Sequence, residues 1–367
     1  MAMQLALVHD YLCQMGGAER VALEFTRIFP EASFFTSVYN PGAVALDFKK
    51  VDIQTTYMQH FPFISKIFRY YFPFYPRAIE SFNLNKYDLI LSSSSAYAKG
   101  IKKPSSACHI CYCHNPARFL YQYDLYMQQE TIPVGLKQVL PLILKKLEQW
   151  DQQNTQGVDF FIANSQVVKE RIQRIYQRDS DIINPPVDTS FFTPQNCGEG
   201  DYFLVVSRLK PYKKIDLAVT ACRNLGLPLV IIGEGEDHAR LKKLAGPKTR
   251  FLGKTTDSQL VHYYNNCRAL VFTGEEDFGI VPLEAMSCGK PVIAYKAGGV
   301  LETVLAGKTG TFFEEQTTSA LEKALRLFKP GDFDGQFIRK HAEKFDVKIF
   351  RQKIKNYVEQ KYKEFRV

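Results

Sequence analysis

Two acidic residues flank the predicted start of a helix in the second half of the chain. Glu276 lies in a loop after an apolar strand, and Glu284 follows Pro282, which the first helical turn tolerates. Glu284 is expected in that turn, where the helix dipole favours a carboxylate. The two carboxylates could accept hydrogen bonds from a polyhydroxylated ligand, while the N–H groups at Gly279 and Ile280 face a phosphate. An acidic cap on an ordinary helix is the alternative.

Two basic residues follow another predicted strand. Arg208 ends this strand and Lys213 opens the next helix, so both are expected in one crevice at the carboxyl ends of the strands, where ligands bind in such sheets. The planar fork of Arg and the point charge of Lys could together hold a diphosphate. A solvated basic loop is the alternative.

Gly16, Gly17 and His114 follow predicted strands in the first half. The two glycines precede a helix, so their N–H groups could approach a phosphate or sugar closely, or they could form a tight turn. His114 precedes Pro116 at the end of its strand, where it could contact a ligand in the cleft. A structural histidine with satisfied hydrogen bonds is the other interpretation.

Three cysteines and two histidines between Cys108 and His114 raise the question of zinc. The spacing lacks a second ligand pair, and Cys111 and Cys113 alternate along a predicted buried strand, so no metal site is predicted. The segment 233–235 (Gly-Glu-Gly) also follows a strand, but it has no third glycine and acidic residues follow it. A dinucleotide site there is therefore not expected.

The elements that must position these residues alternate between short β-rich runs and helical patterns. Strands are predicted at 4–8, 34–38, 88–91, 109–113, 159–163, 202–206, 229–232, 250–252, 269–272, 291–295 and 310–313, with helices that include 18–28, 141–153, 213–224, 257–266, 282–287 and 318–328. This alternation favours α/β architecture with parallel sheets covered on both faces, in two doubly wound domains. Two prolines in 184–188 mark the boundary, and an amphipathic helix ends the chain.

Composition narrows the class of protein. The 367 residues are 46% hydrophobic and 23% charged, which excludes a mainly disordered chain, and eight cysteines are too few for a disulfide scaffold. No apolar run is long enough to span a membrane and no secretory signal is expected, so the predicted location is cytoplasmic. The net charge of +9 suits phosphate ligands, nucleic acid or an anionic membrane. The Lys and Arg residues form no stripe, which argues against nucleic acid.

The stretch from Ile53 to Ile79 contains no acidic residue. Nine Tyr and Phe residues surround Lys66, Arg69 and Arg77, a composition that suits a membrane interface. Three prolines break the stretch into short pieces. A packed aromatic subcore of the first domain is the alternative.

In their order and spacing, these segments resemble the retaining glycosyltransferases of family 4, which have the GT-B fold. The resemblance extends over essentially the whole chain and rests on the motifs at 16–20, 113–116, 207–213, 276–286 and 298–304. It implies two Rossmann-like domains facing across a cleft. These would be an acceptor-binding domain at 1–185 and a nucleotide-sugar-binding domain at 186–345, with a C-terminal helix at 346–367 that crosses back onto the first.

The resemblance also implies residue roles. Glu284 would bind the ribose hydroxyls, and Arg208 with Lys213 or the adjacent Lys214 would bind the diphosphate. Glu276 would hold the donor sugar together with the backbone of the segment Phe278–Gly279–Ile280. In the first domain, His114 would hydrogen-bond the sugar near the reacting carbon, and Gly17, next to Gly16, would leave room for the phosphate.

The expected reaction is metal-independent transfer of a hexose with retention of configuration, without a cofactor. The motifs are most similar to those of GDP-mannose-dependent mannosyltransferases of bacterial polysaccharide assembly, and UDP-sugars remain an alternative. The acceptor would be a glycan or polyisoprenoid-linked, with the enzyme peripheral on the inner face of the plasma membrane. A sugar-nucleotide epimerase or a phosphorylase would share the architecture, but no lysine is singled out for the pyridoxal cofactor of a phosphorylase.

Overall fold

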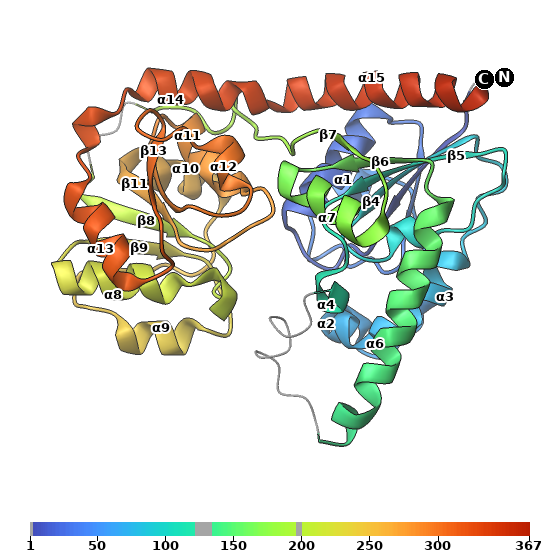
Figure 1. Ribbon diagram of the computed structural model, residues 1–367, viewed down its shortest axis with the longest axis horizontal. Coiled ribbons are helices and arrows are strands. Elements are labelled where there is room, and N and C mark those ends of the chain that lie inside the picture. Colours follow the sequence, from blue (N-terminus) through green and yellow to red (C-terminus); the bar gives the residue numbers. More distant parts are fainter. Residues whose placement is uncertain (1–2, 122–133, 196–199) are drawn as a thin grey trace. The chain divides into compact units, whose positions relative to one another are not determined.

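The computed structural model describes residues 3–121, 134–195 and 200–367, without the side chains of 134–138 (Figure 1). The chain divides into two compact units. The first contains Met1–Asn184 and Phe350–Val367, and the second contains Pro185–Ile349. Each unit is built on one parallel sheet, as the alternation of strands and helices predicts.

The sheet of the first unit has the strand order β3-β2-β1-β4-β5-β6-β7 in the described part of the chain. Its strands are β1 (Leu5–His9), β2 (Ser33–Thr36), β3 (Ile53–Thr55), β4 (Leu89–Ser94), β5 (Cys108–Cys113), β6 (Phe160–Ala163) and β7 (Asp181–Ile182). The central strands β1, β4 and β5 are buried along their whole length, because helices cover both faces. The chain reverses its direction across the sheet between β1 and β4, which makes their carboxyl ends a topological switch point.

In the described part of the first unit, helices lie around this sheet (Figure 1). They are α1 (Gly17–Ile28), α2 (Ile64–Ile67), α3 (Tyr75–Glu80), α4 (Arg118–Tyr121), α6 (Val134–Asn154), α7 (Gln166–Tyr176) and α15 (Val347–Arg366). From Phe350 onward α15 packs on the first unit. Phe350, Ile354 and Val358 lie in the same core as Phe25 of α1, and Arg351 pairs with the buried Glu24 at 2.6 Å. The amphipathic pattern at the end of the chain therefore covers the sheet of the first unit.

The sheet of the second unit has the order β10-β9-β8-β11-β12-β13 in the described residues. Its strands are β8 (Tyr202–Val206), β9 (Leu229–Ile232), β10 (Thr249–Phe251), β11 (Cys267–Phe272), β12 (Val292–Tyr295) and β13 (Gly310–Phe313). Its helices are α8 (Ile215–Leu225), α9 (His238–Leu244), α10 (Asp257–Asn266), α11 (Ile280–Ser287), α12 (Val300–Thr303), α13 (Thr318–Leu327) and α14 (Gly335–Ala342). The switch point of this sheet lies between β8 and β11.

Both predicted sheets are confirmed, and the differences are local. The predicted strands and helices of the second half match within two residues. Among the helices, α8 begins two residues later than predicted, after Lys214 adopts a left-handed φ of 53°, and α11 begins two residues earlier. The sequence analysis did not predict β3 and β7, because two or three residues carry too little periodicity.

The aromatic stretch 53–79 is divided between core and surface. Ile64, Phe68 and Tyr75 belong to the core of the first unit, whereas Phe63 and Tyr70 are 76% and 71% exposed. Lys66, Arg69 and Arg77 are also exposed. The stretch folds into short helical turns, as its prolines predict.

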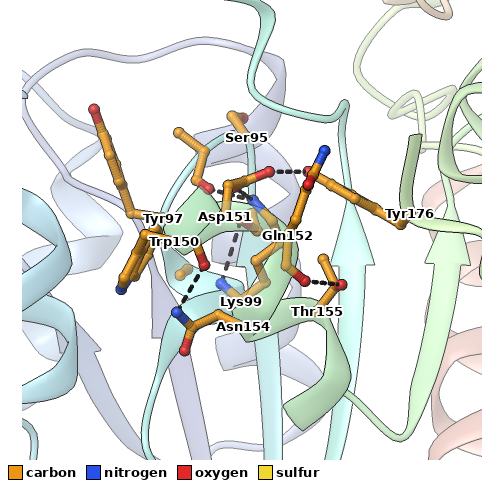
Figure 2. Close-up of polar contacts among 12 residues, drawn as sticks. Ser95, Tyr97, Lys99, Trp150, Asp151, Gln152, Asn154, Thr155 and Tyr176 are labelled. Carbon is orange, nitrogen blue, oxygen red and sulfur yellow. Dashed lines mark hydrogen bonds and ion pairs between the residues drawn. The ribbon is translucent and has the colours of Figure 1, made fainter. Parts of the chain in front are cut away.

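A buried ion pair stabilises the segment that follows β4. Lys99 lies 2.5 Å from Asp151 of α6, and both side chains are 1% exposed. The hydroxyls of Tyr121 and Tyr176 donate to the same carboxylate, and Figure 2 shows Tyr176 and Lys99 on either side of it. Because removing either charge would leave its partner buried and unpaired, this cluster fixes α4, α6 and α7 to the end of β4.

Candidate functional site

The switch point of the second unit brings two predicted site residues together. The Lys213 ammonium forms an ion pair with the Glu276 carboxylate, with side chains 9% and 27% exposed. The loop after β11 lies directly against Lys213, since the Thr273 hydroxyl donates to the Lys213 carbonyl at 2.9 Å. At Gly274 a Cβ would come within 3.2 Å of that carbonyl. A cation and a carboxylate are thus held at the carboxyl ends of β8 and β11, where Brändén's rule expects a ligand.

Lys213 and Lys214 differ in their surroundings. Lys213 is buried beside Glu276, with its ammonium 5.0 Å from the centre of the Tyr212 ring. Lys214 is exposed, and its ammonium forms no ion pair with any described residue. Arg208 is exposed as well, and its guanidinium donates to the Tyr212 hydroxyl at 3.3 Å. Tyr212 therefore contacts both Arg208 and Lys213.

The Gly-Glu-Gly segment 233–235 supports the loop that carries Arg208. At Gly233 and Gly235 an added Cβ would collide with the carbonyls of Ser207 and Leu209. The Leu209 N–H donates to the Glu234 carbonyl at 2.9 Å, so the two loops run together as hydrogen-bonded backbone. The segment that resembled a weak dinucleotide motif is a close backbone contact, which only glycine permits.

Glu284 is buried in α11, with 4% of the residue exposed. The helix begins at Ile280 with Gly279 as its N-cap, so Glu284 lies in the second turn. The expectation of a first-turn position was wrong, because the helix begins two residues earlier than the proline indicated. The hydroxyl of Tyr264 in α10 donates to Glu284 Oε2 at 2.8 Å. The sequence analysis missed Tyr264, since it lies on another helix 20 residues away.

The glycine pair 298–299 determines the path of the acidic loop. Glu276 forms a parallel bridge with Gly298, and the Gly299 N–H donates to the Glu276 carbonyl at 2.8 Å. A Cβ at Gly298 or Gly299 would collide with the backbone of Glu276 or Asp277, and Gly298 also has a φ of 75°. Phe278, only 3% exposed, anchors the loop in the core.

The remaining predicted site residues belong to the first unit. Gly16 is the N-cap of α1 and Gly17 its first residue, and a Cβ on Gly16 would come 2.9 Å from Glu19 Oε2. The preceding Asp10, 1% exposed, accepts backbone N–H bonds from all four residues 95–98, at 2.6–3.0 Å. Its charge is therefore compensated within the protein.

His114 is held at three points. Its N–H donates to the Ser94 carbonyl at 2.8 Å, and its own carbonyl accepts from the Asn164 amide at 3.0 Å. Its Nε2 lies 2.8 Å from the Ser93 hydroxyl, which is also 3.0 Å from Nδ1 of His9. The sequence analysis missed Ser93 and His9. The run of four serines at 92–95 was the available signal, because hydroxyls in a buried strand need partners.

The cysteine-rich strand is part of the core. Cys111 and Cys113 pack with Val158, Phe161 and neighbouring apolar residues, and burial raises the pKa of the Cys111 thiol to about 12. Within residues 3–121, 134–195 and 200–367, no group of three His, Cys, Asp or Glu side chains is placed to hold a metal ion. In the same residues, no helix has both the length and the apolar character that crossing a membrane requires.

Comparison with known proteins gives matches in both halves of the chain. A family model described as Glycosyltransferase Family 4 matches residues 15–191, and one described as Glycosyl transferases group 1 matches residues 188–344. The human alpha-1,3/1,6-mannosyltransferase ALG2 is 27% identical over 67% of this chain and 66% of its own length. An uncharacterized glycosyltransferase of Methanocaldococcus jannaschii is 26% identical over 47% of this chain and 50% of its own length. The chain therefore spans half to two thirds of these curated relatives.

The fold matches that of solved glycosyltransferase structures. The Anabaena protein HepE, solved in complex with UDP and glucose, superposes with a TM-score of 0.71 at 17% identity, over 97% of this chain and 99% of its own. At this identity the likeness establishes the fold alone. With its two halves matched by glycosyltransferase family models, and with the GT-B fold, the chain belongs to the family 4-like glycosyltransferases.

Proposed function

We propose that the protein transfers a hexose, with mannose favoured, from a nucleotide diphosphate sugar to a hydroxyl of a glycan or lipid-linked acceptor. The observation that carries this proposal is the Lys213–Glu276 pair at the switch point, followed on the next helix by the buried Glu284. The cation would neutralise a diphosphate leaving group, Glu276 would hold sugar hydroxyls, and Glu284 would hold the ribose. The second unit would bind the donor and the first the acceptor.

Turnover would proceed with retention of configuration and without a metal ion. Arg208 and Lys213 would stabilise the charge that builds on the diphosphate as the glycosidic bond breaks. The acceptor hydroxyl would enter on the face that the phosphate leaves, and the phosphate would take its proton. His114 would hydrogen-bond the donor sugar near the reacting carbon. The backbone at Phe278–Ile280 would hold the donor sugar together with Glu276, and Gly17, next to Gly16, would leave room for the phosphate.

A thermal-shift screen of nucleoside diphosphates and their sugars can identify the base and the sugar of the donor. A ligand that binds only the folded protein raises its melting temperature. GDP-mannose is the favoured donor, supported by the likeness to a named mannosyltransferase, and UDP-glucose is the alternative, since HepE was solved with UDP and glucose. A larger shift with GDP than with UDP would support GDP-mannose as the donor.

Two further measurements test the reaction scheme. The anomeric configuration of the product, determined by NMR, tests retention. Loss of activity in chelator that Mg²⁺ restores would contradict the metal-free scheme.

A sugar-nucleotide epimerase is the competing function on this architecture. An epimerase converts the donor without a second sugar, so incubation with donor alone distinguishes the two. A transferase leaves the donor unchanged or hydrolyses it slowly, whereas an epimerase yields a second nucleotide sugar.

We further propose reversible association with an anionic membrane on the inner face of the plasma membrane, where a polyisoprenoid-linked acceptor would reside. The support is the exposed aromatic surface of Phe63 and Tyr70 beside exposed Lys66, Arg69 and Arg77. Each basic residue would add about 1 kcal/mol near charged lipid. Co-sedimentation with anionic vesicles at low salt should fall when Lys66, Arg69 and Arg77 are changed to Ser. Equal pelleting of the two proteins would contradict the proposal.

A further inference from the structure

A chain of buried hydrogen bonds leads to His114 from inside the first unit. His9 of β1 and Ser93 of β4 are paired residues in the parallel sheet, and both are 1% exposed. The Ser93 hydroxyl lies 3.0 Å from His9 Nδ1 and 2.8 Å from His114 Nε2. In the described residues these two rings are the only partners of that hydroxyl.

The direction of this chain follows from one further contact. His9 Nδ1 also lies 3.1 Å from the carbonyl oxygen of Ser93. A carbonyl oxygen only accepts, so Nδ1 of His9 carries a proton and donates. The Ser93 hydroxyl then accepts from His9, and its own proton is directed at the other ring. If His114 carried its proton on Nε2, the hydroxyl would receive two donors and its buried proton would have no acceptor.

We infer that His9 and Ser93 are positioning residues, which fix His114 as the tautomer with its proton on Nδ1 and hold its ring in place. The inference rests on the proposed function, because the tautomer matters for turnover only if His114 contacts the donor sugar. In this tautomer the ring proton lies on Nδ1, which acts as a hydrogen-bond donor, and Nε2 acts as the acceptor. The backbone bonds to Ser94 and Asn164 and the Tyr112 ring, 5.1 Å away between centroids, restrict the remaining freedom.

The neighbouring serine provides a matched control. Ser92 is 0% exposed, and its hydroxyl lies 2.8 Å from Nε2 of another buried histidine, His109. Because side chains alternate along a strand, Ser92 faces the opposite side of the sheet from Ser93. Ser92→Ala therefore removes the same group from the same strand without touching His114.

The tautomer can be measured directly in the wild-type protein by ¹⁵N NMR of the histidine rings, with His114 assigned from a His114→Gln variant. We expect a pyrrole-like Nδ1 and a pyridine-like Nε2 for His114, and loss of this single pattern in Ser93→Ala. A pyrrole-like Nε2 in the wild type would overturn the inference, whatever the activity of the protein.

Kinetics test the consequence. Ser93→Ala should lower kcat by about 10- to 100-fold with little change in donor KM, because a misplaced group costs that much in rate. Ser93→Thr keeps the hydroxyl, and His9→Asn keeps a hydrogen-bond donor near the position of the His9 Nδ1 atom, so both variants should retain most of the wild-type kcat. Ser92→Ala should match the wild type. Equal losses in Ser92→Ala and Ser93→Ala would overturn the positioning role. Full turnover in His114→Ala would overturn both the positioning role and the role proposed for His114. Unchanged kcat in Ser93→Ala alone would overturn only the positioning role of Ser93 and His9.

Discussion

The two units have the same kind of switch point but use it differently. At β1 and β4 of the first unit, the polar groups are buried and satisfied by one another, as with Asp10 and the four N–H groups of residues 95–98. At β8 and β11 of the second unit, Arg208 and Lys214 are exposed, and the Lys213–Glu276 pair is partly open to solvent. Topology therefore determines where polar loops gather, and residue type determines whether their polar groups are satisfied within the protein or stay open to solvent.

The comparison predicts that removing a polar side chain at the first switch point lowers the stability of the protein. Asp10→Ala should lower the free energy of unfolding by about 4 kcal/mol or more, because charge-assisted hydrogen bonds contribute about 1.5–3 kcal/mol each and four buried donors lose their acceptor. Urea denaturation would measure it. Asp52→Ala is the control, since Asp52 is exposed and should change stability by less than about 0.5 kcal/mol. A stable Asp10→Ala protein without activity would mean that Asp10 serves a ligand instead.

Removing a charged side chain at the second switch point should lower activity instead of stability. Lys213→Ala is expected to lower kcat by about 100- to 1,000-fold, or about 3–4 kcal/mol, because removing one preorganised donor to a developing charge costs this much. Steady-state kinetics of Lys213→Ala and Lys214→Ala distinguish the two lysines, which the sequence could not. A larger loss in Lys214→Ala would show that the lysine facing Glu276 is not the phosphate ligand.

A smaller effect is expected for the carboxylate proposed to bind ribose. Glu284→Ala should weaken the binding of nucleoside diphosphate by about 1–3 kcal/mol, since a buried hydroxyl would lose its acceptor. Isothermal titration with GDP and UDP would measure the change. Tyr264→Phe, which removes only the hydroxyl that donates to Glu284, should weaken binding less. Unchanged affinity in Glu284→Ala would exclude the ribose role.

The smallest effect, counted per pH unit, concerns the acid sensitivity of the first unit. Burial, assisted by the charge of Lys103, lowers the pKa of His109 from 6.5 to about 3. The unfolded chain therefore binds one more proton than the folded protein between these values. The stability that neutral His109 provides is complete above pH 6.5 and falls by about 1.4 kcal/mol per pH unit as pH drops toward 3. Unfolding titrations of the wild type and His109→Gln should differ by this slope, and parallel curves would contradict the assignment.

Much of the fold follows from local patterns. The apolar strands 202–206 and 229–232 appear within the predicted bounds, because a strand that is covered on both faces has one continuous run of apolar residues. The acidic loop, the basic loop and the His114 turn were located for a similar reason, since each follows such a strand. The sequence thus determined the class of fold, the order of its elements and the segments that meet at strand ends.

The tertiary structure decided which side chains meet. The choice of Lys213 over Lys214 as the partner of Glu276 depends on the left-handed turn at Lys214, and the contact of Ser93 with His9 and His114 depends on the order and register of β1, β4 and β5. The same holds for Gly233 and Gly298. No side chain fits at these positions, because the backbone of a loop elsewhere in the chain lies against each of them. Periodicity reports only whether a residue is buried, whereas pairing across a sheet depends on strand order, and no local pattern contains that order.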